Sequence, residues 1–317
     1  MAVDAATFLT FSAIGNREDL SDKIYNIDPV ETPFLSGIER VKTAATNHEW
    51  QTQALAAVSS VNSVLEGDDG TTDTATATAR LGNIHQISDK VARVSGTQRA
   101  VEHAGRDDEL DYQIMLKGRE LKRDMETILL ANQKKATGSP SVPRAVGAVL
   151  SWLITNTSKG TNGSDPLAAD GTSTRTDGTM RAFTEALLKS VLQSVWINGG
   201  DPDTILTGAF NKQQFSTFTG RSTPMEQASS RKIVAAVDYY DSDFGKLKVV
   251  PDRFMRARDV LVLQMDMWKL ATLPGRNMVS QPLAKTGDSD RRQILTEYTL
   301  VSGNEKASGG VFDVSSA

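Results

Sequence analysis

The stretch from residue 64 to residue 79, VLEGDDGTTDTATATA, decides the fold together with the charged segment that follows it, Gly105 to Lys135. The first stretch is a polar, acidic tip between two segments with β-like alternation. A two-stranded arm of this kind is marginally stable at best in water, because it has no core of its own. Something outside the chain must therefore hold it, most simply other copies of the same chain. The pattern favours an assembly subunit over a self-contained enzyme.

Two segments on either side of the tip are predicted to be strands. Residues 46–58 alternate well enough for one strand, and residues 84–98 alternate more clearly. Within the tip, turn-forming residues follow one another from Gly67 to Gly70. The apolar positions of the second segment are Ile84, Ile87, Val91 and Val94.

The segment Gly105–Lys135 predicts one long helix, about 40–45 Å at about 1.5 Å per residue. Acidic residues in its first turns, and Lys134 and Lys135 at its end, complement the helix macrodipole. Its apolar stripe, at spacings of three and four, is formed by Leu110, Ile114, Gly118, Leu121, Met125 and Leu129. The opposite face, expected to be solvated or to meet a neighbour, carries Lys117, Arg119, Lys122, Arg123 and Glu126.

The composition indicates an extended molecule. The 317 residues allow one large domain or two, but only 39% are hydrophobic and 6% aromatic, which predicts a high ratio of surface to core. A net charge of -4 argues against a dedicated nucleic-acid-binding surface. The absence of cysteine excludes disulfides, thiolate nucleophiles and cysteine metal sites.

The sequence also gives no sign of export or membrane insertion. No apolar run reaches the ~18–20 residues of a membrane span. The N-terminus lacks the basic region and apolar core of a signal peptide. We therefore expect synthesis in the cytoplasm and no membrane partner.

Residues 1–45 are expected to form an arm. Pro29 and Pro33 favour extended backbone before them. The apolar residues follow no sustained period; they are Phe8, Phe11, Ile24, Tyr25, Ile27, Phe34 and Leu35. Two interpretations remain open: the arm docks on a surface built elsewhere, or it supplies a strand and a short helix to the same domain.

The rest of the chain is mixed α and β. Residues 156–178 form a long loop of the kind that is usually functional or mobile, and residues 179–196 predict a second amphipathic helix with Phe183, Leu187, Val191 and Val195 on one face. A short strand at 203–208 and a third helix at 209–218 follow. Further strands are expected in 232–240, 245–252 and 259–273, and three more in 278–314.

No motif for catalysis or cofactor binding is present. His48 and His85 in the arm suggest a metal pair, but with His103 they are better interpreted as polar structural residues. Two carboxylate groups suggest calcium but are expected to be solvated loops: Glu66, Asp68, Asp69 and Asp73 in the tip, and Asp165, Asp170 and Asp177 further on. No catalytic, cofactor-binding or metal-binding residue is therefore assigned, and no enzyme is expected.

The order of these parts resembles the major capsid protein of tailed bacteriophages. That α+β fold, the Hong Kong-97 type, is shared with herpesvirus coats. Two stretches also resemble a family of phage head proteins first catalogued as a domain of unknown function: DKIYNIDPVETPFLSGI at 22–38 and RRQILTEYTLVSGNEKASGGV at 291–311.

The resemblance implies an anatomy. It comprises an N-terminal arm at 1–45, an extended β-loop at 46–98, a peripheral domain with the spine helix at 99–145, an axial domain at 146–275, and peripheral return strands at 276–317. Some members of the fold cross-link a loop lysine to another subunit. Here residues 64–80 contain no lysine, and Lys90 lies in a predicted strand, so that chemistry is not carried over.

The resemblance also implies a function. It predicts a structural subunit of an icosahedral or prolate phage capsid in the virion, which self-assembles into hexamers and pentamers and encloses double-stranded DNA without tight sequence-specific binding. Portal, scaffolding and decoration proteins are further candidate partners, and no cofactor is implied. The alternatives are an encapsulin-like compartment shell, an uncharacterised enzyme, or a fibre or adhesin domain.

Overall fold

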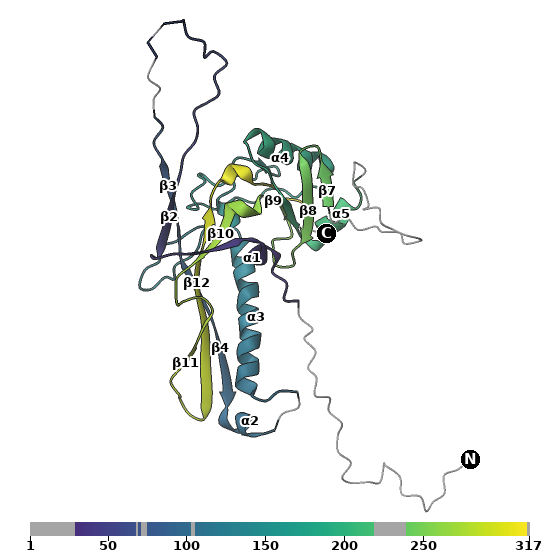
Figure 1. The fold of residues 1–317 in the computed structure, drawn as a ribbon. Helices are drawn as coiled ribbons and strands as arrows, with labels where there is room; N and C mark the ends of the chain where they lie inside the picture. Colours follow the sequence, from purple (N-terminus) through teal and green to yellow (C-terminus); the bar gives the residue numbers. More distant parts are fainter. Residues whose placement is uncertain (1–28, 68, 71–74, 103–104, 219–238, 316–317) are drawn as a thin grey trace, which may run out of the picture.

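The computed structural model describes residues 29–67, 69–70, 75–102, 105–218 and 239–315, which form the α+β fold of Figure 1. The helices are α1 (Pro33–Gly37), α2 (Gly96–Ala100), α3 (Glu109–Leu129), α4 (Glu185–Ile197) and α5 (Ala209–Phe215), with short 3-10 helices η2 (Val149–Ser151), η3 (Met265–Met267) and η4 (Glu305–Ala307). The strands are β1 (Glu39–Lys42), β2 (Asn47–Thr52), β3 (Ala79–Ile84), β4 (Gln86–Ser95), β5 (Thr157–Ser158), β6 (Thr204–Thr207), β7 (Tyr239–Ser242), β8 (Gly245–Pro251), β9 (Asp259–Leu263), β10 (Trp268–Thr272), β11 (Val279–Pro282), β12 (Ser289–Ser302) and β13 (Gly309–Phe312).

Some of the residues discussed above lie outside this description. They are Phe8, Phe11, Ile24, Tyr25 and Ile27 of the arm, Asp68 and Asp73 of the tip, His103, and the strand expected from residue 232 as far as residue 238. The structure therefore gives no account of them.

A five-stranded sheet forms the elongated half of the molecule, in the order β1-β10-β12-β11, with β4 also paired to β12. The long strand β12 is antiparallel to β4 along ten residues, from Ser289 opposite Ser95 to Tyr298 opposite Gln86. Helix α3 runs beside β4 and β12 (Figure 1). Ala92 and Val94 of β4 pack there against Leu110, with Ile114 partly buried beside them.

A six-stranded sheet forms the other half, in the order β5-β13-β9-β6-β8-β7. Helix α4 packs on it through an apolar face that includes Leu188, Val191, Leu192 and Val195. Two of the predicted face residues, Val191 and Val195, are confirmed as buried.

The predicted start of this helix was wrong. Helix α4 begins at Glu185, six residues after Thr179. The Arg181 N–H donates to the Asp313 carbonyl, and the Ser315 N–H donates to the Arg181 carbonyl. Because this backbone is held extended beside the C-terminal segment, it cannot enter the helix.

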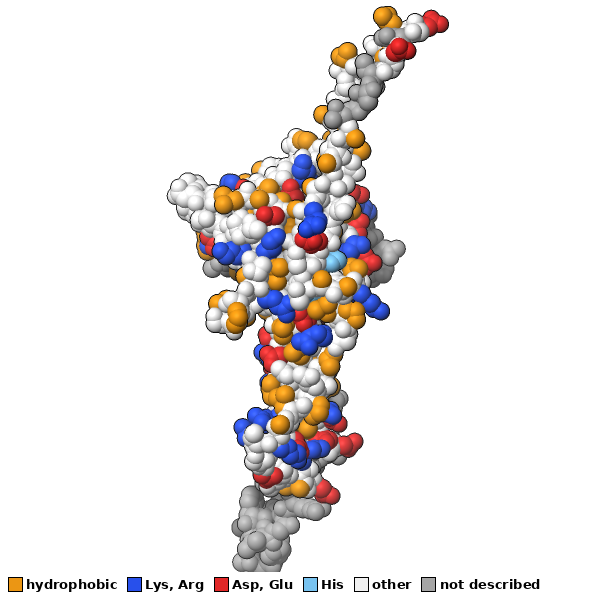
Figure 2. All heavy atoms as spheres, turned by 90° about the vertical axis from the view of Figure 1, so that its left-hand side faces the viewer, with side chains coloured by type: hydrophobic (Ala, Val, Ile, Leu, Met, Phe, Trp, Pro, Cys, Tyr) orange, Lys and Arg blue, Asp and Glu red, His pale blue; other side chains and the backbone are white. Residues whose placement is uncertain are grey.

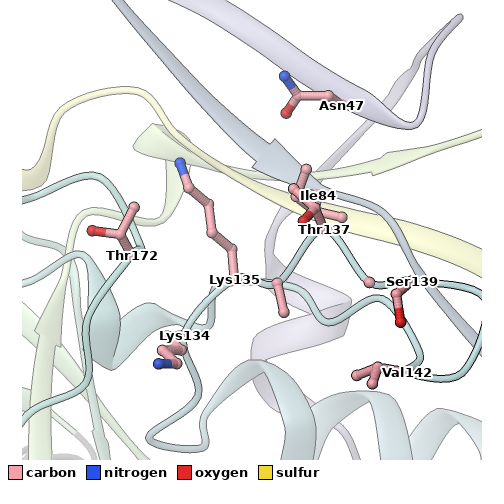
Figure 3. A pocket seen from close by; sticks show the side chains of 10 residues that line it. Asn47, Ile84, Lys134, Lys135, Thr137, Ser139, Val142 and Thr172 are labelled. Atoms are coloured by element: carbon pink, nitrogen blue, oxygen red, sulfur yellow. The ribbon is translucent and has the colours of Figure 1, made fainter.

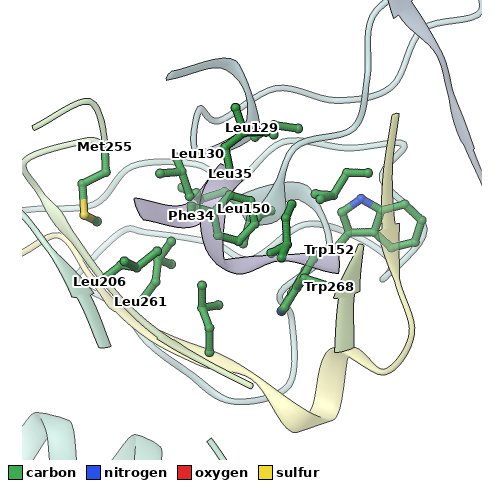
Figure 4. Close-up of a cluster of buried hydrophobic side chains, with 14 of the residues drawn as sticks. Phe34, Leu35, Leu129, Leu130, Leu150, Trp152, Leu206, Met255, Leu261 and Trp268 are labelled. Atoms are coloured by element: carbon green, nitrogen blue, oxygen red, sulfur yellow. The ribbon is translucent and has the colours of Figure 1, made fainter. Parts of the chain in front are cut away.

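The two halves meet at one large core (Figure 4). Phe34 and Leu35 of α1 are buried there beside Leu129 and Leu130 from the end of α3. Strand β1, which follows α1, pairs in parallel with β10. For residues 33–42 the second interpretation of the arm is therefore confirmed: they supply a short helix and a strand to the chain's own fold.

Helix α3 confirms the predicted apolar stripe but not the predicted length. Leu121, Met125 and Leu129 are at most 3% exposed. The helix begins after Asp108, whose Oδ1 accepts from the Leu110 N–H at 2.7 Å, and it ends at Leu129. The expectation of lysines in the last turn was wrong, since no basic residue lies there. Lys135 instead donates to the Gly82 carbonyl at 2.6 Å, because the chain after the helix turns towards β3.

The strand predicted at 84–98 is two shorter strands with different partners. Strand β3 pairs with β2 and ends at Ile84, whereas β4 pairs with β12. On β4 the alternation is also reversed from that expected, because Ala92 and Val94 face α3 while Ile87 and Val91 are 44% and 43% exposed. A partner strand some 200 residues away determines which face is buried.

The five-part domain division stays a prediction. The strand pairing crosses its boundaries in two places. Strand β13 lies in the six-stranded sheet, and β10 lies in the five-stranded one. Any assembled domain must therefore contain segments from both ends of the chain.

Candidate assembly surfaces

The coil between β2 and β3, residues 53–78, is named the loop arm here, and it projects far from the body (Figure 1). Near its base, Gln53 donates to the Thr76 carbonyl at 2.8 Å. Its large apolar side chains are 77–101% exposed: Leu55, Val58, Val61, Val64 and Leu65. Exposed apolar groups in such number mark a contact surface for another molecule. The loop arm is therefore the first candidate assembly surface.

The base of the loop arm is fixed to the body. Asn83 of β3 is fully buried and donates to the carbonyls of Gly147 and Leu300 at 2.9 and 2.8 Å. The ring of Trp50 on β2 lies 5.5 Å from that of Trp152 in the large core. The hairpin is thus a rigid base that carries an unsupported arm.

A groove of about 600 Å³ lies beside this base (Figure 3). Its lining combines residues from β2 and β3 with the segment after α3: Asn47, Ile84, Lys134, Lys135, Thr137, Ser139, Val142 and Thr172 among them. The lining contains neither carboxylate nor histidine, so it offers no acid–base pair for catalysis. Val142, which is 55% exposed at its rim, is better suited to packing than to chemistry.

A second exposed apolar cluster, the tip patch, consists of Trp196, Ile197, Tyr239 and Phe244. It joins the end of α4 to β7 and the β7–β8 turn. The rings of Trp196 and Phe244 are stacked with centroids 5.5 Å apart. Aromatic side chains that are partly stacked and still exposed are typical of protein interfaces, so the tip patch is the second candidate assembly surface.

The opposite end of the molecule is held by ion pairs instead. Arg99 donates to Asp290 at 2.7 Å and to Asp108 at 2.6 Å, and Lys285 lies 2.5 Å from Asp290. These groups are partly exposed, and surface pairs of this kind stabilise a fold only slightly. Their role is to hold α2 and the start of α3 against β12.

The histidines do not form a metal site in the part of the chain described. His85 is fully buried, and its Nε2 lies 3.0 Å from the Thr43 hydroxyl. Burial lowers the pKa of His85 to about 4 and also lowers the pKa of His48. No group of three or more potential metal-ligating side chains is found among the described residues.

The carboxylates of the 156–178 loop are paired rather than solvated. Asp165 contacts Lys159 and Arg175, and Asp177 contacts Arg256 at 2.5 Å. Asp170 accepts from the Thr172 hydroxyl at 2.6 Å. The expectation of solvated side chains was therefore wrong at Asp165 and Asp177, because arginines from elsewhere in the sequence reach them. In the tip, Glu66 and Asp69 are exposed as expected.

Lys90 and Glu126 also depart from the sequence interpretation or complete it. Lys90 of β4 forms an ion pair with Asp124 of α3 at 2.7 Å, so it is already engaged within its own chain. Glu126, placed on the outer face of the helix, is fully buried. That placement was wrong because its partners, the N–H groups of Phe34 and Leu35, lie about 90 residues away. Helical periodicity carries no signal of them.

Comparison with known proteins identifies the family. A family profile described as SU10 major capsid protein matches residues 5–315. The chain belongs to the SU10 major capsid protein family. A curated major capsid protein from Escherichia phage Phieco32 is 26% identical over 342 residues, which cover 96% of each chain. The chain is therefore a capsid shell subunit of the virion.

Solved structures show the fold of this capsid protein. A chain from Gordonia phage Cozz gives a TM-score of 0.61 at 9% identity, over 95% of this chain and 92% of that one. The capsid of a native GTA particle gives 0.61 at 12% identity, over 95% and 96%. The holo-SrpI encapsulin complex from Synechococcus elongatus PCC 7942 gives 0.57 at 11% identity, over 96% and 94%. The predicted Hong Kong-97-type fold is confirmed.

The structure adds one finding about membranes. Among the described residues, no helix combines the length and the apolar character needed to cross a membrane.

Proposed function

We propose that this capsid subunit assembles into hexamers and pentamers of a closed icosahedral or prolate shell, which encloses double-stranded DNA without sequence-specific binding. The observation that carries the proposal is the loop arm. Five large apolar side chains stand in water there, and burying a Val or Leu side chain contributes about 1.5–3 kcal/mol. A neighbouring copy supplies the missing contacts, and many such contacts add up over a closed shell.

The predicted anatomy supports this arrangement. The loop arm extends over a neighbour, and the six-stranded sheet with its tip patch forms the axial domain around the five-fold and six-fold axes. The elongated sheet and α3 form the peripheral domain. The chain is made in the host cytoplasm, with portal, scaffolding and decoration proteins as further candidate partners, and it catalyses no reaction.

A matched pair of variants in the loop arm tests the proposal. Val61→Asp and Asn62→Asp each add one negative charge at neighbouring exposed positions, but only the first removes an apolar contact. Electron microscopy and light scattering of the purified full chain should show capsomers or shells for wild type and Asn62→Asp, and impaired assembly for Val61→Asp. A wild-type protein that stays a ~34 kDa monomer at high concentration and varied salt would overturn the proposal.

An encapsulin-like compartment shell is the second candidate, because a structure of that kind shares the fold over nearly the whole chain. The contents of the particle discriminate between the two. Nuclease-protected double-stranded DNA inside shells isolated from their natural source supports the capsid, whereas a single co-purifying protein cargo without DNA supports the compartment.

A further inference from the structure

Two acidic side chains meet inside the molecule where α1, α3 and the end of β8 converge. Glu126 of α3 is fully buried, and its Oε1 and Oε2 accept from the N–H groups of Phe34 and Leu35, each at 2.7 Å. Those are the free N–H groups of the first turn of α1, which begins with Pro33. Thr32, the residue before that turn, provides no side-chain cap. The Glu126 carboxyl group therefore caps α1 from a distant part of the chain.

Asp252, the residue after β8, is the second member of the pair and is 2% exposed. Its Oδ1 accepts from the Phe254 N–H at 2.8 Å. Its Oδ2 is buried, and no donor among the described residues satisfies it by hydrogen-bond geometry between fixed groups. The side chain that acts on it is Glu126. A proton on Glu126 would give Asp252 Oδ2 the donor that it lacks.

The surroundings offer no other charge to balance the pair. Helix α1, PFLSG, contains no titratable side chain, and the neighbouring core is apolar around Leu129, Leu130 and Leu150 (Figure 4). Asp252 is the charged group that acts on Glu126. Two carboxylates cannot both ionise cheaply in such a site, because desolvation and mutual repulsion both oppose the second charge.

We propose that Glu126 and Asp252 share one proton at neutral pH and form a latch that holds the N-terminal segment against α3 and the six-stranded sheet. The Glu126 carboxyl donates its proton to Asp252 Oδ2 and still accepts both N–H groups of α1. Burial, followed by the charge of Asp252, raises the pKa of Glu126 to about 8, and burial raises the pKa of Asp252. When the proton is lost, two like charges face each other at the joint, and α1 is released.

The direction of the pH dependence follows from linkage. Between the usual pKa of a glutamate, about 4.5, and about 8, the folded chain holds a proton that the unfolded chain has lost. Raising the pH through this window therefore destabilises the fold, and the unfolding equilibrium constant rises about tenfold per pH unit from this pair alone. The contribution is complete below the window and lost above it.

Asp252→Asn provides the sharpest test. The asparagine Oδ1 can still accept from the Phe254 N–H, and its amide can donate to an ionised Glu126, so the hydrogen bonds survive without the shared proton. Infrared spectra of the full wild-type chain at neutral pH should show a protonated carboxyl band that disappears as pH passes about 8. Subtraction of the Glu126→Gln spectrum assigns the band to this pair. The band should be missing from Asp252→Asn.

Limited trypsin digestion gives a second readout, at Arg40 and Lys42 in β1, directly after α1. Cleavage there should increase in wild type as pH rises through about 8, relative to Asp252→Asn at the same pH. Asp241→Asn, an exposed carboxylate on β7, is the control and should behave like wild type.

Three outcomes would overturn the latch. One is a neutral wild-type protein with no protonated carboxyl that Glu126→Gln removes. Another is a band that persists in Asp252→Asn. The third is the same pH dependence of cleavage in wild type and Asp252→Asn. The infrared measurement on wild type and Glu126→Gln stands even if Asp252→Asn does not fold. None of these readouts depends on shell assembly.

Discussion

Buried polar side chains join segments of this protein that are far apart in the sequence. Asn156 donates to the carbonyls of Lys306 and Ser308 and accepts from the Ser194 hydroxyl. Asp313 accepts from the N–H groups of Gly160 and Gly178. A buried polar group that lost such partners would destabilise the fold by about 1–3 kcal/mol. These residues therefore hold the long 156–178 loop in place.

The apolar stripe of α3 makes a prediction at the scale of one residue. Leu121 is fully buried, whereas its neighbour Lys122 is exposed. Leu121→Asp should destabilise the fold by several kcal/mol, comparable to the stability of a whole domain, because a carboxylate would be buried without a partner. Expression followed by thermal melting of the soluble fraction measures the effect. Lys122→Ala is the control and should melt like wild type; equal tolerance of both changes would show that the helix face is assigned incorrectly.

Sequence reasoning worked for residues whose role is set by local periodicity, and it failed for residues whose role is set by a distant partner. Leu121, Met125 and Leu129 were found because they repeat along one helix. Glu126 lies next to Met125 and has the same composition signal as a solvated glutamate. Its burial follows from α1, which no pattern within the helix reveals.

At the scale of elements, α3 connects two separate cores. Its first half packs on β4 through Leu110, and its last turns lie in the large core through Leu129. A helix with this position transmits any displacement of the elongated half to the body. Its length and its apolar stripe could be predicted approximately from the sequence, but its end could not, because the segment that follows takes its direction from β3.

The glycine in this helix predicts a stabilising substitution. A Cβ at Gly118 would lie 3.8 Å from both Ile294 and Met278, which is ordinary van der Waals contact. Glycine in a helix interior is less favourable than alanine by roughly 0.5–1 kcal/mol. Gly118→Ala should therefore raise the free energy of unfolding by about that amount in a denaturant titration.

Gly309→Ala is the opposite control. A Cβ there would lie 2.4 Å from the Asn156 carbonyl oxygen, which is backbone and cannot move aside easily. This variant should be destabilised. If Gly118→Ala were destabilised as well, the packing of α3 against β12 would be tighter than the structure shows.

The loop arm predicts an effect on assembly without an effect on the subunit fold. Its described residues from 67 to 77 are exposed and contribute nothing to either core. Deleting Gly67–Ala77 should change the free energy of unfolding of the subunit by less than about 0.5 kcal/mol, and it should impair the formation or stability of shells in electron micrographs. Melting of the isolated subunit after the deletion would mean that the tip is buried in its own chain.

At the scale of the whole molecule, the two sheets exchange chain segments repeatedly. Strand β9 lies in the six-stranded sheet and β10 in the other, although only η3 and one further residue separate them. Strands β12 and β13 are divided in the same way. The sequence allowed the order of the elements, and hence the fold class, to be recognised. It could not assign strands to sheets, because hydrophobic alternation is the same in either sheet.

The distribution of charge leads to a prediction about DNA. On the face shown in Figure 2, lysine and arginine side chains are interspersed with aspartate and glutamate rather than gathered into one basic area, and the whole chain carries a net charge of -4. Binding to duplex DNA releases counterions in proportion to the phosphates neutralised, so it requires a basic surface and weakens steeply with salt. A shell holds its genome by confinement and needs no such surface.

The soluble subunit should therefore show negligible affinity for duplex DNA near ~0.15 M salt, with at most weak attraction at low salt. Fluorescence anisotropy of a labelled duplex, repeated across a salt series, measures both the affinity and its salt dependence. A subunit that merely encloses DNA gives no saturable binding at the higher salt. A submicromolar complex that persists there would show that the chain contacts nucleic acid through a site of its own, since confinement plays no part before assembly.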